Sequence, residues 1–207
     1  MFQGTTLCSC LAVLAGSADM KSRVWNFETD TPDALPAGFT KELGEWKVAA
    51  DETAPSKRHV LAQAAKSPKP DYNVVLVDSV QAKNLDLSVH LKPIAGTIDQ
   101  GGGVVWRAKD AKNYYICRYN PLENNFRVYK VVDGRRTELA SADIQKTDGW
   151  QTLRITMREE QIECFLDGKK HLEVNDGTFG VAGRIGLWTK ADAQTHFDDL
   201  TLKPKDE

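Results

Sequence analysis

The stretch GGGVVWRAKDAKNYYICRYNPLENNFRVYKVV, from Gly101 to Val132, decides the fold of this chain. Its apolar and aromatic residues fall into three short runs, and polar turn residues separate the runs. Runs of this kind with turn signals between them are typical of an antiparallel meander. We therefore expect strands at 104–107, 114–119 and 126–131.

The same pattern continues on both sides of the meander. Residues 85–91 place leucine or valine at every second position, and residues 150–157 alternate in the same way. Asp133-Gly134 is a residue pair that tight hairpin turns prefer. No segment has a helical period of useful length. About a dozen short strands with regular turn signals predict one all-β domain, a two-sheet antiparallel β-sandwich or jelly roll.

Composition and charge exclude some function classes. The 207 residues are 41% hydrophobic and 27% charged, which suits one domain with a substantial core. The formal net charge is −2, and lysine and arginine form no run. The chain therefore lacks the basic field that draws proteins to nucleic acid or to anionic membrane surfaces. We expect no nucleic-acid binding and no membrane span.

The first 18 residues differ from the rest of the chain. Residues 5–18 are small, apolar and uncharged, like the core and cleavage region of a secretory signal peptide, although no basic residue precedes them. This run is too short to span a membrane as a helix. The alternative is an uncleaved tail. We expect a signal peptide at 1–18, a domain at 19–207, and a secreted or periplasmic protein.

If Cys8 and Cys10 leave with the signal peptide, Cys117 and Cys164 remain. Both fall on predicted strands and alternate with apolar neighbours, so two buried core thiols are the simpler interpretation. A disulfide is the alternative, because a pair of cysteines in an exported domain permits one.

Four segments resemble a known protein family. They are NYYICRYNPLENNFRVYKVVDGRR (113–136), GWQTLRITMREEQIECFLDGKK (149–170), DGTFGVAGRIGLWTKAD (176–192) and FDDLTL (197–202). Through them the chain resembles the bacterial concanavalin A-like (lectin/glucanase) jelly-roll proteins of the 3-keto-disaccharide hydrolase group, and most of all their small secreted branch. The resemblance implies a jelly roll with one concave sheet, export and an association with sugars. It implies no particular catalytic residue.

Aromatic and basic side chains are the candidates for contact with a carbohydrate. Aromatic rings offer flat faces to sugars, and arginine offers a rigid fork of hydrogen-bond donors. Strand alternation puts Ile116 and Arg118 on one face of their strand and Tyr115 on the other. We expect Trp106 to lie in the core. The candidate ligand-binding residues are Arg107, Tyr115, Arg118, Trp188 and Lys190.

No strong catalytic motif is present. Retaining glycosidases on this fold use an E-x-D-x-x-E strand, whose carboxyl groups lie about 5 Å apart. The nearest match, at 28–33, contains Pro32 and turn residues and ends in aspartate. Three hypotheses stay open: an exported carbohydrate-binding domain without catalysis, a glycoside-processing enzyme of the 3-keto-disaccharide hydrolase type, and a cell-envelope protein-interaction domain.

Three acids suggest a structural calcium site. Glu28 and Asp30 follow the first predicted strand, and Asp198 lies on the last. First and last strands are often neighbours in a jelly roll, and calcium takes six to eight oxygen ligands of this kind. The alternative is that Glu28 and Asp30 cap a solvated turn. Calcium is the one cofactor that the sequence suggests.

Overall fold

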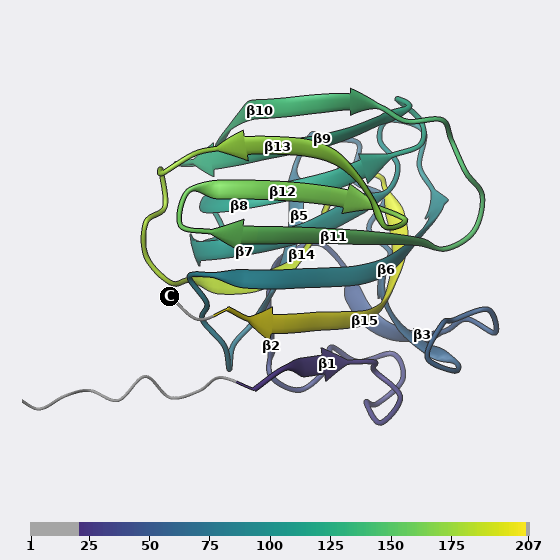
Figure 1. Cartoon of the computed structure of the whole chain (residues 1–207). Coiled ribbons are helices and arrows are strands. Elements are labelled where there is room, and N and C mark those ends of the chain that lie inside the picture. The colour runs from purple at the N-terminus through teal and green to yellow at the C-terminus, as the bar shows by residue number, and fades with distance from the viewer. Residues whose placement is uncertain (1–20, 206–207) are drawn as a thin grey trace, which may run out of the picture.

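The computed structural model describes residues 21–205, so the expected signal peptide at 1–18 lies outside the described residues. Within this range the chain forms fifteen strands in two antiparallel sheets packed face to face (Figure 1). The all-β sandwich expected from the sequence is confirmed. Among residues 21–205, no helix is long and apolar enough to cross a membrane.

Sheet A, at the front in Figure 1, has eight strands. Their order is β13 (Lys169–Asn175), β12 (Gln161–Leu166), β11 (Gln151–Arg158), β6 (Leu85–Ala95), β15 (Gln194–Pro204), β4 (His59–Gln63) and β3 (Trp46–Ala50), with β1 (Arg23–Trp25) also paired to β15. Because β6 pairs with both β11 and β15, strands far apart in sequence lie side by side, as a jelly roll requires.

Sheet B has seven strands and contains the predicted meander. Their order is β10 (Arg135–Asp143), β9 (Asn125–Val132), β8 (Asn113–Asn120), β7 (Gly102–Asp110), β14 (Arg184–Lys190), β5 (Tyr72–Val77) and β2 (Phe39–Leu43). The predicted strands 104–107, 114–119 and 126–131 lie within β7, β8 and β9. The sequence pattern does not predict β2, because four of its five residues are exposed and give no alternation signal.

The main core lies between the two sheets. Every second residue of β6 and β11 points inward, so Leu87, Val89, Leu153 and Ile155 are fully buried. Trp106 is also buried there, as expected, with its ring stacked on a neighbouring tyrosine. The period-two pattern read from the sequence is therefore the pattern of core-facing side chains.

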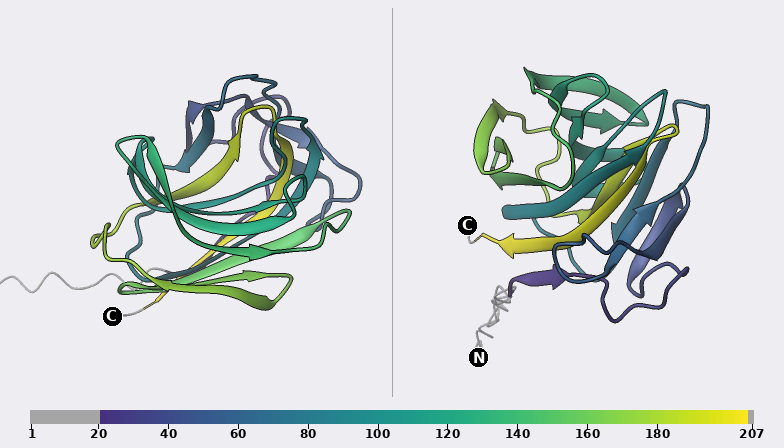
Figure 2. Two further views of the ribbon diagram at one scale, coloured as in Figure 1. Left: turned by 90° about the horizontal axis from the view of Figure 1, so that it is seen from above. Right: turned by 90° about the vertical axis from the view of Figure 1, so that its right-hand side faces the viewer.

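A second apolar cluster covers the outer face of sheet B. Sheet B curves so that this face is concave and turned away from sheet A (Figure 2). Both faces of its central strands are therefore buried, unlike the usual antiparallel sheet with one solvated face. The buried residues of this cluster are Val74, Leu76, Val105, Ala108, Tyr114, Ile116, Tyr129, Val131 and Trp188.

Cys117 and Cys164 are free thiols buried in the main core. Burial raises the pKa of the Cys117 thiol well above its usual value, and the neighbouring Cys164 raises it further. Since the thiolate is the reactive form, Cys117 is unreactive in the folded protein, and burial keeps reagents away from Cys164 as well. The expectation of two core thiols is confirmed.

We therefore expect Cys117 and Cys164 of the native protein to be unreactive toward a thiol reagent such as dithionitrobenzoate. In a chain with Cys8→Ser and Cys10→Ser, two thiols should titrate only after denaturation. A native chain that reacts quickly, or a denatured chain that shows no thiol without reductant, would contradict the buried-thiol assignment.

Candidate functional site

Four aromatic rings line the concave face of sheet B. Tyr72 lies on β5, Trp188 on β14, Tyr114 on β8 and Tyr129 on β9, all at positions that point away from sheet A. The Tyr72 and Trp188 ring centroids are 5.4 Å apart, and the Trp188 indole N–H donates to the Tyr114 hydroxyl at 3.2 Å. The rings thus form one connected cluster across the sheet.

Arg136 reaches into this cluster from β10. Its guanidinium carbon lies 4.3 Å from the ring centroid of Tyr129, 5.5 Å from that of Tyr72 and 5.7 Å from that of Trp188. Three strands separate β10 from β14 in sheet B, so contact between them depends on the curvature of the sheet. We call Arg136 and the four rings the arginine–aromatic cluster.

A buried charge network lies beside this cluster. Arg118 on β8, only 1% exposed, donates from Nη2 to Glu123 Oε2 at 2.9 Å, and its Nη1 lies 4.0 Å from Asp99 Oδ1. Lys190 on β14 donates to the other Asp99 oxygen at 3.2 Å, and Asn120 donates to Asp99 Oδ1 at 2.9 Å. Two basic and two acidic groups therefore neutralise one another on this face.

The surroundings set the protonation of these groups. Burial raises the pKa of Asp99, and the charges of Arg118 and Lys190 offset part of that rise. Burial would also raise the pKa of Glu123, but hydrogen bonds from Asn125 and Arg118 lower it to about 2. Glu123 is consequently an anion at neutral pH, and it carries no proton to donate.

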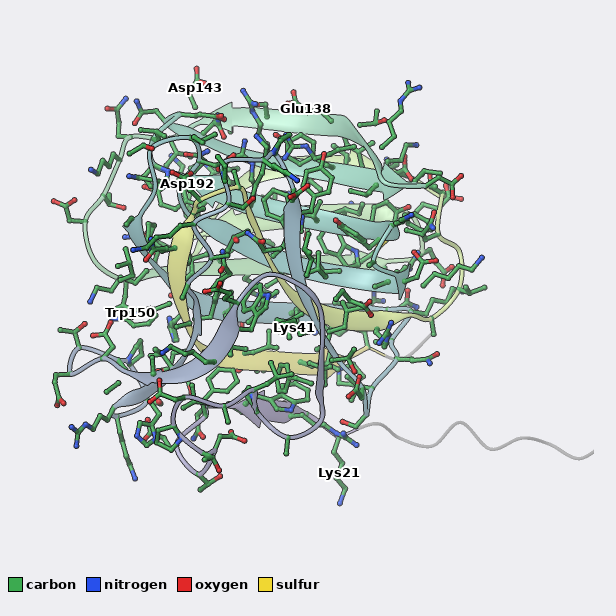
Figure 3. The ribbon with its side chains drawn as sticks, turned by 180° about the vertical axis from the view of Figure 1, so that it is seen from behind. Lys21, Lys41, Glu138, Asp143, Trp150 and Asp192 are labelled. Atoms are coloured by element: carbon green, nitrogen blue, oxygen red, sulfur yellow. The ribbon has the colours of Figure 1, made fainter. Side chains whose placement is uncertain are left out.

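Three of the five candidate ligand-binding residues come together here. Arg118, Trp188 and Lys190 all belong to the concave face, and Arg118 and Lys190 share Asp99. Figure 3 views the molecule from this side, with Glu138 and Asp143 on β10 at the margin. The other two candidates, Arg107 and Tyr115, lie elsewhere.

Tyr115 points into the main core. Its ring stacks on Trp106 with centroids 5.5 Å apart, and its hydroxyl donates to Asp176 Oδ1 at 2.7 Å. The same hydroxyl accepts a hydrogen bond from the backbone N–H of Phe179 at 3.2 Å. Tyr115 thus fastens the loop after β13 to the core, and it cannot reach a ligand on the concave face.

Arg107 is buried and structural. Its φ of 47° belongs to a register irregularity in β7, which breaks strict alternation and turns the side chain toward one end of the sandwich. There its guanidinium donates to the carbonyl oxygens of Lys83, Phe179 and Glu159 at 2.7–2.8 Å. One side chain therefore joins three loops.

A cavity of about 510 Å³ opens beside Arg107. Its lining includes Lys109, Arg184 and the loop 178–184, but neither an acid nor a histidine. The other polar side chains of this lining are Gln81 and Thr178, and the donors of Arg107 are already bonded to backbone carbonyl oxygens. The arginine–aromatic cluster and its charge network gather aromatic rings, basic groups and acids on one face, so they are the stronger candidate for binding a polar ligand.

Sequence reasoning missed several residues of this site. Strand alternation from Arg118 could have identified Tyr114, which lies four residues earlier on the same face. Strand alternation could not have identified the residues that sheet curvature or loops place at the site, because they are distant from it in the sequence. The missed residues are Tyr72, Asp99, Tyr114, Glu123, Tyr129 and Arg136.

The suggested calcium ligands meet only in part. The Ser56 hydroxyl oxygen lies 3.0 Å from a carboxylate oxygen of Glu28 and 3.0 Å from one of Asp198, and its single proton is shared between these two acceptors. Glu28 also accepts backbone N–H groups from Arg58 and His59 at 2.8 Å, and Asp198 accepts that of Ser56 at 2.8 Å. These carboxylates therefore fasten the loop before β4 to β1 and β15.

This pair offers little to a calcium ion, because both oxygens of Asp198 and one oxygen of Glu28 already accept protein hydrogen bonds. Asp30 is not among the groups that bond to Ser56, Glu28 or Asp198 in the described chain. Within residues 21–205, no group of three or more His, Cys, Asp or Glu side chains is arranged to hold a metal. Calcium binding stays a prediction that this geometry does not favour.

Solved structures share the fold of this chain. The carbohydrate binding module CBM66 from Bacillus subtilis has a TM-score of 0.68 and 18% identity, over 80% of this chain and 96% of that one. A Bacillus licheniformis beta-glucanase has a TM-score of 0.60 and 12% identity, over 91% and 100%. No curated protein sequence matches the chain. These similarities define a concanavalin A-like jelly-roll sandwich.

A family model gives the more specific assignment. The model of the 3-keto-alpha-glucoside-1,2-lyase-like domain matches residues 38–203, and the chain belongs to this family. Family and fold together make it a jelly-roll domain of the carbohydrate-binding or glycoside hydrolase-like kind.

Replacing Arg107 should destabilise the end of the sandwich where its three loop partners lie and should leave the concave face unchanged. Arg107→Ala leaves three carbonyl oxygens without their charged donor, so we expect a loss of about 3 kcal/mol in the free energy of unfolding. Urea titration measures this loss, and Arg158→Ala, an exposed residue at the end of β11, is the control. Equal stability of the two variants would show that the three hydrogen bonds contribute little.

Calcium should have no effect on stability. Because only Glu28 and Asp198 of the three acids come together, and three of their four carboxylate oxygens already accept protein hydrogen bonds, we expect the same melting temperature in excess calcium and in EGTA. A rise with calcium that disappears in Asp198→Asn would restore the calcium site suggested by the sequence.

Proposed function

We propose that this protein is an exported carbohydrate-binding domain that binds a sugar on the concave face of sheet B without catalysing its conversion. The observation that carries this proposal is the arginine–aromatic cluster. It combines flat aromatic rings, a fork of donors and a neighbouring charge network on one curved sheet. Of the four rings only Tyr72 is partly exposed, so a sugar would contact Tyr72 and the polar groups at the edge of the cluster.

The comparisons support a sugar as the ligand class. The family description names a glucoside, and the module with the same fold is described as carbohydrate binding. Export is part of the proposal on the basis of the small apolar run at 5–18.

The state of the acids supports binding rather than catalysis. An effective general acid has a pKa near the working pH and contacts the substrate. Glu123, with a pKa of about 2, is held as an anion by Arg118 and Asn125. Asp99 is 1% exposed and already pairs with Lys190, so a sugar on the face cannot reach it as the side chains stand.

A second candidate is an enzyme that acts on 3-keto-glucosides, which the family match favours. In that case Asp99 is the residue that would exchange a proton, because burial raises its pKa beside two basic groups. Substrate binding would have to separate Asp99 from Lys190 to expose it. The charge network would then rearrange during each turnover.

Binding should depend on residues at the accessible edge of this face. We expect Tyr72→Ala and Lys190→Met each to weaken the binding of a glycan by about tenfold, since each removes a contact of roughly 1–2 kcal/mol. A thermal-shift screen against oligosaccharides and 3-keto-glucosides finds the ligand, and calorimetry then measures its affinity.

Lys203→Ala, an exposed residue of β15 in the other sheet, is the matched control and should bind as the wild type does. No stabilisation by any sugar would reject the binding proposal. Release of product from a 3-keto-glucoside, lost in Asp99→Asn, would replace it with the enzyme candidate.

A further inference from the structure

Arg136 differs from the other basic residues of the concave face in lacking an acidic partner. Arg118 pairs with Glu123, and Lys190 pairs with Asp99. Arg127 on β9 lies 3.4 Å from Glu138 and 3.8 Å from Glu123. For Arg136, no carboxylate of the described chain lies within ion-pair distance of the guanidinium. Its positive charge is balanced only by aromatic rings.

The same guanidinium covers the aromatic surfaces that a neutral sugar would use. Stacking needs a free ring face, and the faces of Tyr129, Tyr72 and Trp188 all lie within 5.7 Å of the Arg136 guanidinium carbon. Cation–π attraction holds the group there. A ligand that approaches therefore encounters the N–H groups of an arginine before it encounters an aromatic ring.

Some of these N–H groups have no partner. Arg136 Nη1 is buried and makes no hydrogen bond within the described protein, and neither Nε nor Nη1 of the buried Arg118 makes one. Buried donors without partners are costly, and those of a charged group most of all. A carboxylate is the group best suited to these unpartnered donors, because its two oxygens match the planar fork of a guanidinium.

The position of Arg136 is also fixed before any ligand arrives. It lies opposite Val131 in the β9–β10 pairing, next to the tight turn at Asp133-Gly134. Three rings restrict its side chain, so little conformational entropy is lost when it binds. Low solvent access around Nη1 strengthens its interaction with an anion.

We propose that the concave face selects sugars that carry a carboxylate, that is, uronic acids, and that Arg136 is the group that binds the carboxylate. This inference rests on the proposed function, since it names the ligand class of the same face. The aromatic rings act mainly to hold the arginine, and the sugar ring then packs at the edge of the cluster beside Tyr72.

The test compares matched acidic and neutral glycans. Oligomers of galacturonate, glucuronate and mannuronate are titrated calorimetrically into the full chain, each beside its methyl ester, which has the same skeleton without the charge. We expect at least one acid to bind about tenfold or more tightly than its ester, with an affinity that falls as salt is added.

Variants at β10 assign the effect to one residue. Arg136→Gln should weaken binding of the acid about tenfold or more, and Arg136→Lys should recover only part of it because lysine lacks the planar fork. Arg136→Ala frees the ring faces, so binding of the neutral ester should rise instead. Arg135→Gln, the exposed neighbour on the same strand, should bind as the wild type does. Unchanged melting temperatures establish that each variant is folded.

The outcomes separate the two proposals. Esters that bind as tightly as acids, or an Arg136→Gln chain with unchanged affinity for the acid, would overturn carboxylate selection while sugar binding stands. Binding of sulfated glycans alone would also overturn it, because the anion would then not be a carboxylate. No binding of any glycan would overturn both proposals.

Discussion

The curvature of sheet B is the constraint on which the rest of the structure depends. A flat antiparallel sheet packed on one partner leaves its outer face in water. Here the outer face bends inward until a side chain of β10 contacts the aromatic rings of β14 and β5. The outer face becomes a second interior, and polar groups on it experience the electrostatics of a core.

That environment explains the composition of the site. Charged groups without water need partners, and Arg118 has Glu123 and Asp99 within 4.0 Å. Arg136 has aromatic rings instead, which attract a cation but accept no conventional hydrogen bond. The face is thus neutral where its charges are paired and electropositive where they are not. A charged ligand bound to this face would therefore have a preferred orientation.

Alternation along the strands made most of the fold predictable. The meander and the inward positions of β6 and β11 follow from period-two patterning, and so does the separation of Arg118 from Tyr115. The pattern fails to predict the direction of a side chain where one residue departs from the regular strand conformation. The positive φ of Arg107 turns this candidate ligand-binding residue away from the concave face, and no residue type in GGGVVWRAKD predicts that conformation.

The site was less predictable for two physical reasons. Arg136 and Tyr72 are 64 positions apart in the sequence, and only sheet curvature brings them together. Glu28 and Asp198 do meet, as the first and last strands suggested, but backbone donors reach them and alter their chemistry. The order of strands along the chain indicates which strands are neighbours. The hydrogen-bond partners of a carboxylate depend instead on the conformation of nearby loops.

The place of β10 at the edge of sheet B has a further consequence. This strand pairs with β9 alone within the sheet, and most of its residues are at least partly exposed. Edge strands open more readily than central ones, so a ligand of this face would bind with an apparent affinity reduced by the fraction of molecules in which β10 is displaced. Substitutions in the Asp133-Gly134 turn touch no ligand, yet they change that fraction. The stability of the β9–β10 hairpin would therefore affect ligand affinity without any change in the arginine–aromatic cluster itself.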